Sequence, residues 1–451
     1  MNGLLADQLR ELVADDLASP AATGLTGDDR REFARQQIFV HLDALAAEGD
    51  LWPTADDHDG ERRLAQTVLD ALFGMGRLQA LIDNPEIENI DINGCDRVWV
   101  TRADGSKRMV APVADTDDEL VELVRSAAGR FGLSERRFDM ARPELDLQLP
   151  GGSRLSALMA VAARPAVSIR RHRFAQLSLD DLVDLGTLDE GVALLLGAAV
   201  RARKNIVVSG AMNSGKTTLL RALAAEIPAR ERIVTIEQAF ELGLDGDVER
   251  HPDMVALEAR PANVEGEGLI TVADLVRRAL RMNADRVIVG EVLGDEVLPM
   301  LNAMSQGRSG SMCTIHADSS AGVFRRIASY AVQAPERLPL ESTNLLTAGA
   351  IDFVVHLDSE AYDSMERFDG TWADDGGGPD GFGPLTARRR FVSSIREVVD
   401  AEGIQVVSNE VFRPGPDRRA VPSSPLRTET IRALGVFGYQ PPGVTSIGAF
   451  A

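Results

Sequence analysis

The sequence feature that most constrains this chain is the glycine-rich segment GAMNSGKT at residues 210–217. Glycines let a backbone curl until successive N–H groups converge on phosphate oxygens. The β-branched residues 206–208 before it predict a buried strand, and residues 216–226 after it predict a helix whose positive end faces the loop. The arrangement predicts a phosphate-binding loop rather than an ordinary glycine turn.

The polar residues of this loop have distinct expected tasks. Lys216 would reach the β and γ oxygens of a nucleotide, and the Thr217 hydroxyl would bind Mg²⁺. The other residues expected to hold the nucleotide are Gly210, Asn213, Ser214, Gly215 and Thr218. The chain has 3 lysines against 45 arginines, and the lysine here supports the prediction because an ammonium and a guanidinium are not interchangeable.

Two later segments read as buried strands that end in a carboxylate, Glu237 and Glu291. In a doubly wound sheet, ligands gather at the carboxyl ends of the strands. Glu291 is therefore expected to polarise the attacking water or to hold the Mg²⁺ shell. The alternative for each acid is that it only caps the following turn, and this alternative carries more weight for Glu237.

Histidine and arginine positions are less informative when taken alone. His316 lies in a Ser/Thr-rich segment, and an isolated histidine is more often structural than catalytic. Arg154 and Arg170 lie on strands that precede the loop region, where arginines usually cover a solvated surface. No histidine spacing indicates zinc, and 2 cysteines exclude a disulfide framework.

Apolar periodicity divides the chain into four parts with an overall α/β class. Alternating strands and helices from Ser178 predict a mostly parallel sheet. The expected parts are a helical N-terminal extension at 1–62, an α+β domain at 63–177, the domain that holds the loop at 178–360, and, at 361–451, an antiparallel strand pair with an acidic Gly-rich loop and an irregular tail from Pro414.

The net charge of −21 excludes a chain that binds nucleic acid along its whole length, since it repels phosphate backbones. Residues 1–60 carry 13 acidic side chains against 4 arginines, a net −9, so much of the excess lies outside the loop region. The acidic N-terminus lacks the basic start of a signal peptide, and the longest apolar run, 192–200, is too short to span a membrane. A cytoplasmic protein with only peripheral membrane association is expected.

Residues 250–317, joined to the loop, resemble the secretion-superfamily ATPases. Within them the chain is similar to the CpaF/TadA-type motors of Tad (Flp) pilus assembly, in an actinobacterial form. The segments NPEIENIDINGCDRVWVT, LDLQLPGGSRLSA and VSIRR also match, so the resemblance spans about residues 65–425.

The resemblance implies a homo-hexameric ring that hydrolyses ATP with Mg²⁺ and works with inner-membrane platform proteins. It implies a RecA-like P-loop ATPase domain preceded by a PAS-like α+β domain. Glu237 then falls in the Asp box and His316 in the His box. Arg154 and Arg170 would reach the γ-phosphate, which replaces their surface interpretation.

The sequence departs from the family pattern at three positions: Gln238 in the Asp box, Leu293 after Glu291, and Arg308 at the start of the His box. These departures leave open a nucleotide-gated scaffold with weak turnover. A second alternative is the ATPase of a type IV secretion or conjugation system. An ABC-type subunit is excluded because no LSGGQ-like segment precedes residues 286–291.

Overall fold

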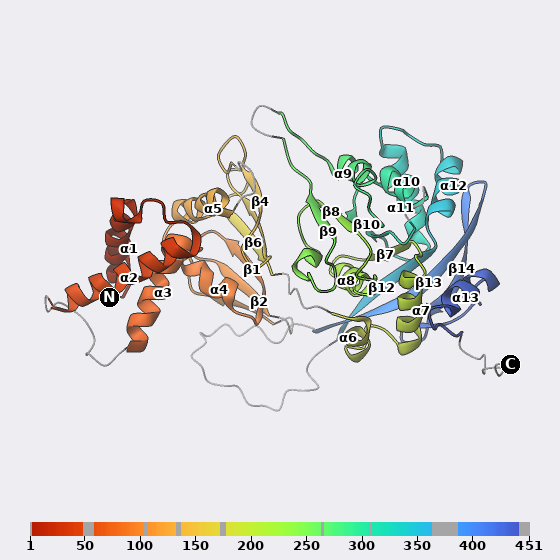
Figure 1. Ribbon diagram of the computed structural model, residues 1–451, viewed down its shortest axis with the longest axis horizontal. Helices are drawn as coiled ribbons and strands as arrows, with labels where there is room; N and C mark the ends of the chain where they lie inside the picture. The colour runs from red at the N-terminus through yellow and green to blue at the C-terminus, as the bar shows by residue number, and fades with distance from the viewer. Residues whose placement is uncertain are drawn as a thin grey trace. The chain divides into compact units, whose positions relative to one another are not determined.

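The computed structural model of the protein describes residues 2–47, 58–102, 106–131, 137–171, 177–262, 266–305, 309–362 and 387–441. The described residues fall into two compact units, one up to residue 171 and the other from residue 177 (Figure 1). In the described part of the chain, no helix is long and apolar enough to cross a membrane.

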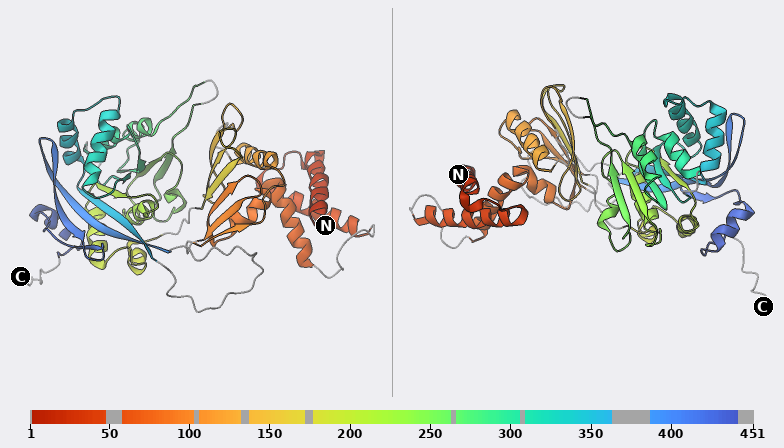
Figure 2. Two further views of the ribbon diagram at one scale, coloured as in Figure 1. Left: turned by 180° about the vertical axis from the view of Figure 1, so that it is seen from behind. Right: turned by 45° about the horizontal axis from the view of Figure 1, so that its top comes forward.

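The first unit begins with three packed helices, drawn in red and orange in Figure 2. Their bounds are α1 (Asn2–Ala18), α2 (Gly27–Ala47) and α3 (His58–Phe73), with a 3₁₀ turn η1 (Pro20–Ala22). Leu9 and Val13 are one helical turn apart on α1, and both are buried against Ile38 and Val68. Helices are therefore present where the sequence predicts an extension.

A six-stranded antiparallel sheet forms the rest of the first unit, in the order β3-β2-β1-β6-β5-β4. Its elements are η2 (Gly76–Leu78), α4 (Gln79–Asp83), β1 (Ile87–Asn93), β2 (Val98–Arg102), β3 (Lys107–Val110), α5 (Asp117–Phe131), β4 (Glu144–Gln148), β5 (Arg154–Leu158) and β6 (Ala166–Arg170). Helix α5 buries Leu120 and Val124 in the core of this sheet. Alternate strand residues point away from that core, which is the usual pattern of a sheet covered on one face.

The second unit is built on a nine-stranded sheet with the order β15-β14-β13-β12-β7-β11-β10-β8-β9. The strands are β7 (Ile206–Gly210), β8 (Ile233–Glu237), β9 (Met254–Glu258), β10 (Arg286–Val292), β11 (Met312–His316), β12 (Phe353–Tyr362), β13 (Ala387–Glu402), β14 (Gln405–Pro414) and β15 (Ala420–Pro422). Strands β7 to β12 pair in parallel, and β13 to β15 extend the sheet antiparallel.

Helices cover both faces of this sheet, so its central strands are apolar on both sides (Figures 1 and 2). On β7, Ile206 and Val208 pack in one core with α7 and α8, and Val207 packs in the other with α9 to α12. The helices are α6 (Leu179–Asp184), α7 (Glu190–Arg201), α8 (Lys216–Ala224), α9 (Val272–Ala279), α10 (Val297–Ser305), α11 (Gly322–Gln333), α12 (Leu340–Ala350) and α13 (Thr428–Gly435), with a 3₁₀ turn η3 (Leu244–Gly246). The predicted α/β class is confirmed.

The C-terminal segment differs in part from its prediction. The antiparallel strand pair is present as β13 and β14, and both strands belong to the same sheet as the loop region. The expectation of an irregular tail from Pro414 is wrong for residues 420–422 and 428–435, which form β15 and α13, because Thr430 and Leu434 of α13 are buried in the unit. The acidic loop at 369–384 lies outside the described residues.

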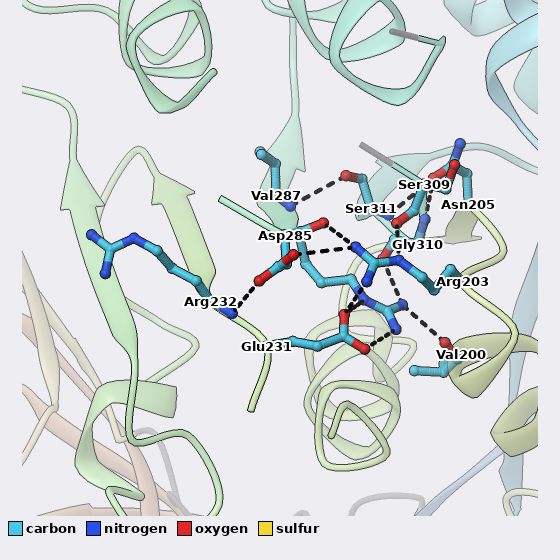
Figure 3. A network of polar contacts seen from close by, with 11 residues as sticks. Val200, Arg203, Asn205, Glu231, Arg232, Asp285, Val287, Ser309, Gly310 and Ser311 are labelled. Atoms are coloured by element: carbon cyan, nitrogen blue, oxygen red, sulfur yellow. Dashed lines mark hydrogen bonds and ion pairs between the residues drawn. The ribbon is translucent and has the colours of Figure 1, made fainter. Parts of the chain in front are cut away.

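A buried polar network closes the amino ends of the parallel strands (Figure 3). Arg286 is fully buried and makes two bonds to Glu231, with Nε 2.7 Å from Oε2 and Nη2 3.1 Å from Oε1. Its Nη1 donates to the carbonyls of Val200 and Gly310. A Cβ at Gly310 would lie 2.1 Å from Arg286, so glycine is required there. The network therefore holds together the amino ends of the parallel strands. The glycine-rich loop lies at the opposite, carboxyl ends of these strands.

Candidate functional site

The glycine-rich loop lies between β7 and α8, as its sequence predicts. Asn213 and Gly215 have φ angles of +60° and +95°, which place both in the left-handed region. A Cβ at Gly210 would lie 2.4 Å from Ser214 Oγ and 2.6 Å from the Leu357 carbonyl. The first glycine is therefore required by the close approach of the loop and β12.

The geometry of this loop fits a phosphate group. Ser214 Oγ is buried and has no hydrogen-bond partner within the described structure. Helix α8 begins at Lys216 with Gly215 as its N-cap, and a glycine has no side chain to cap the first N–H groups. Thr217 and Thr218 lie half-buried on the first turn. The backbone N–H groups and the positive dipole at a helix N-terminus make a suitable anion site.

Lys216, Glu291 and His316 converge beside the loop. Lys216 is 7% exposed, and its Nζ donates to the Ala211 carbonyl at 3.0 Å. The same Nζ lies 3.1 Å from His316 Nδ1 and 4.0 Å from Glu291 Oε1, while His316 Nε2 lies 2.9 Å from that Oε1. The three residues meet because β7, β11 and β10 are neighbours whose carboxyl ends share one edge.

This cluster contains suitable partners for a phosphate and for Mg²⁺. The described residues hold no group of three or more His, Cys, Asp or Glu side chains that could bind a metal by themselves. Mg²⁺ usually takes one or two protein ligands together with phosphate oxygens and water. The Thr217 hydroxyl and the half-exposed Glu291 carboxylate match that donor set.

Glu237 lies in a different environment from Glu291. It is 4% exposed, and its Oε1 accepts hydrogen bonds from the backbone N–H groups of Glu241 and Leu242, both at 2.9 Å. Burial raises the pKa of Glu237 to about 7. A Cβ at Gly290 would lie 2.9 Å from Glu237 Cγ, so this glycine makes room for the acid. The contacts are those of the turn-capping alternative, and a catalytic role for Glu237 stays a prediction.

Arg154 and Arg170 lie directly opposite each other on β5 and β6 of the first unit. Arg154 Nη2 lies 3.6 Å from Asp146 Oδ1, and Arg170 is exposed. Like charges directly opposite each other on a sheet are destabilising, and the Asp146 carboxylate offsets part of this repulsion. The structure brings these two arginines together, in a different unit from Lys216, Glu291 and His316.

The positions that depart from the family pattern are exposed where the structure describes them. Gln238 is exposed, and Leu293 is 51% exposed. The turn that follows Leu293 is capped by Glu296, whose Oε1 accepts from the backbone N–H groups of Leu293 and Gly294. Arg308 lies outside the described residues.

Sequence reasoning missed a contact between the loop and the C-terminal part of the chain. Arg390 on β13 donates from Nε to the Asn213 carbonyl at 3.0 Å, and its Cδ would lie 3.3 Å from a Cβ at Gly215. The run of three arginines at 388–390 was the available signal, since three consecutive positive charges directly precede the apolar residues Phe391 and Val392. A second missed pair, Ser209 and His356, carries no local signal.

A family model described as type II/IV secretion system protein matches residues 73–370. A provisionally named conjugal transfer protein of Mycobacterium tuberculosis is 36% identical over 305 residues, which are 65% of this chain and 82% of the relative. The type IV secretion system protein VirB11 of Brucella suis is 30% identical over 323 residues, covering 65% and 87%. The crystal structure of that VirB11 ATPase with sulphate matches at 29% identity and a TM-score of 0.33, covering 64% of this chain and 89% of the other.

The parallel sheet with a glycine-rich loop at its carboxyl edge defines a RecA-like P-loop ATPase. The family model covers well over half of the chain, and the chain covers more than two thirds of relatives at 30% identity or above. The chain therefore belongs to the type II/IV secretion system protein family. It is an ATPase of that family.

Proposed function

We propose that this chain is the hexameric motor of a Tad (Flp) pilus, of the CpaF/TadA type. The observation that carries the proposal is the convergence of Lys216, Glu291 and His316 at the phosphate loop. The likeness of the N-terminal segments to that branch supports the choice of a pilus motor. The motor works at the inner face of the cytoplasmic membrane, on platform proteins that assemble pilin, and makes no direct contact with nucleic acid.

In this proposal each site residue acts on the phosphates of ATP. Residues 210–218 hold the phosphates, and Lys216 stabilises the charge that develops on the β and γ oxygens. Thr217 and Glu291 would hold Mg²⁺, which would supply neutralisation of the phosphate charge. Glu291 accepts the proton of the attacking water, and His316, which contacts both its carboxylate and Lys216, orients the two side chains.

Arg154 and Arg170 are assigned to the γ-phosphate. They are paired on neighbouring strands of one sheet, and arginine side chains bind phosphate oxygens through charge-assisted hydrogen bonds. Since they lie in the other unit, they would act only when the two units close on the nucleotide.

The test of this proposal is steady-state release of phosphate from MgATP by the purified full-length protein. Wild type should release phosphate, and Lys216→Ala should abolish the release by weakening nucleotide binding. Glu291→Gln should bind ATP but hydrolyse it at least 100-fold more slowly, in line with removal of a general base. Normal hydrolysis by Glu291→Gln would show that another group is the base.

A type IV secretion or conjugation ATPase is the second candidate, and the names of the relatives favour it. Immunoprecipitation from the native organism separates the two, because pilin-assembly platform proteins should come down only with a pilus motor. A nucleotide-gated scaffold is the third candidate, suggested by Gln238 and Leu293. Wild-type phosphate release no higher than that of Lys216→Ala would favour the scaffold.

A further inference from the structure

A buried histidine that the catalytic scheme does not use lies beside the phosphate loop. His356 on β12 is 6% exposed, and its Nδ1 lies 2.9 Å from the hydroxyl of Ser209. Ser209 is fully buried on β7 and directly precedes Gly210, the first residue of the loop. The Ser209 hydroxyl also donates to the Val355 carbonyl at 3.2 Å.

The backbone register explains why these two side chains meet. Ser209 and His356 are directly paired on the parallel strands β7 and β12, so both side chains project from the same face of the sheet. Two residues earlier on each strand, the same face carries Val207 and Val354, both in the apolar core. Val207 and Val354 show that an apolar pair fills this core two residues earlier on the same face. Core packing alone therefore does not require a polar pair at Ser209 and His356.

Polar side chains continue across the sheet from His356 toward the His316 segment. On its other side His356 pairs with Ser394 of β13, whose Oγ lies 2.7 Å from the Oγ of Ser320. Ser320 lies four residues after His316, at the start of the turn into α11. A row of polar residues therefore runs from the base of the loop to the segment that carries His316. Its members are Ser209, His356, Ser394 and Ser320.

The number of protons available to the Ser209 hydroxyl restricts which nitrogen of His356 carries its proton. A serine hydroxyl has one proton, and if it is donated to the Val355 carbonyl the hydroxyl must accept from Nδ1–H of His356. Burial lowers the pKa of His356, which favours the neutral ring, while the charges of Asp358 and Asp318 act to raise this pKa and that of Lys216 to lower it. A neutral ring with its proton on Nδ1 holds the Ser209 hydroxyl in one orientation.

We propose that His356 is a positioning residue for ATP binding, which fixes Ser209 and thereby the start of the phosphate loop. The proposal rests on the ATP-binding role of that loop. Glycines give the loop little stiffness of its own, so its N-terminal anchor must come from the strand that leads into it. Val355 supplies one contact to Ser209, and His356 supplies the side-chain contact that holds its hydroxyl in place.

The experiment compares His356→Leu with His356→Asn in steady-state ATP hydrolysis by the full-length protein. Leucine and asparagine have nearly the same shape, but only asparagine places a polar atom near the position of Nδ1. His356→Leu and Ser209→Ala should each raise KM for ATP about tenfold, the effect of one buried hydrogen bond, with kcat changed less than threefold. His356→Asn should stay within threefold of wild type, and the double variant His356→Leu/Ser209→Ala should equal either single variant.

His251→Leu serves as the control, because His251 is also buried in this unit but its Nδ1 has no partner in the described structure. It should leave KM within twofold of wild type. The inference fails if His356→Leu and Ser209→Ala also stay within twofold, or if their effects multiply to about a hundredfold. If His356→Leu does not fold, a normal KM for Ser209→Ala still overturns it. Inactive wild type would instead overturn the ATPase function.

Discussion

At the scale of single residues, burial separates two acids that look alike in the sequence. Glu237 and Glu291 both end parallel strands, yet Glu237 is 4% exposed and bonded to backbone N–H groups, whereas Glu291 reaches Lys216 and His316. The pKa of Glu237 is raised by desolvation to about 7. The protonated form of Glu237 is therefore stabilised by the folded protein.

Replacing Glu237 by Gln should change how stability depends on pH. The folded-state pKa of Glu237 lies above the ordinary value of 4.5. The stabilisation of the folded protein by protonation of Glu237 is therefore complete below about pH 4.5 and is lost as the pH rises to 7. Wild type should lose up to about 3 kcal/mol more than Glu237→Gln between those limits. Denaturant unfolding at pH 5 and pH 8 measures this, and parallel pH dependence of the two proteins would contradict it.

At the scale of elements, the strand order places all site residues of the second unit at one edge of the sheet. The opposite edge is held by Arg286 and Glu231, which lie where β10 starts and before β8 starts (Figure 3). A buried ion pair stabilises little by itself, but removal of Arg286 would leave the buried Glu231 carboxylate with the partly exposed Arg203 as its remaining cation. The contacts of Arg286 with two backbone carbonyls add further groups that would lose their donor.

Arg286→Met should therefore destabilise the second unit by about 3–5 kcal/mol. The matched control is Arg203→Met, since Arg203 contacts the same Glu231 at 3.1 Å but is 39% exposed. Solvent screening limits the effect of the control to about 1 kcal/mol. Both values come from denaturant unfolding followed by a fluorescence probe. Equal losses of unfolding free energy in the two variants would show that the burial of Arg286 does not determine how much it stabilises the unit.

At the scale of the whole molecule, the residues proposed for catalysis lie in both units. Lys216 is in one unit and Arg154 in the other, so hydrolysis should depend on closure while ATP binding does not. The charge is also unevenly distributed. Residues 1–60 carry 13 acidic side chains against 4 arginines, a net −9 of the total −21, so the strongly negative chain remains compatible with a locally positive site.

Arg154→Ala should preserve the Kd for a fluorescent ATP analogue within about threefold. It should lower kcat by about 100-fold or more, because an arginine of this kind stabilises charge that develops in the transition state. Arg108→Ala is the control, an exposed arginine on β3 of the same sheet, and should change neither quantity. A large loss of ATP affinity in Arg154→Ala would make Arg154 a ground-state contact instead.

The sequence predicts those parts of the site that depend on residues close together along the chain. The strand, the loop and the helix around Lys216 follow from local chain geometry, and the acids at strand ends follow from the period of the strands. The sequence also predicts β13 and β14. It did not predict α13, because that short helix is held by contacts of Thr430 and Leu434 with distant parts of the unit.

By itself, the sequence therefore determined the α/β class, the phosphate loop and the position of Glu291 at a strand end. Only the tertiary structure decided which distant residues meet the loop. His316 reaches Lys216 across 100 residues and Arg390 reaches Asn213 across 177, because β11 and β13 take particular places in the sheet. Local propensity cannot encode strand order, since that order is chosen by the packing of both faces of the sheet against helices far along the chain.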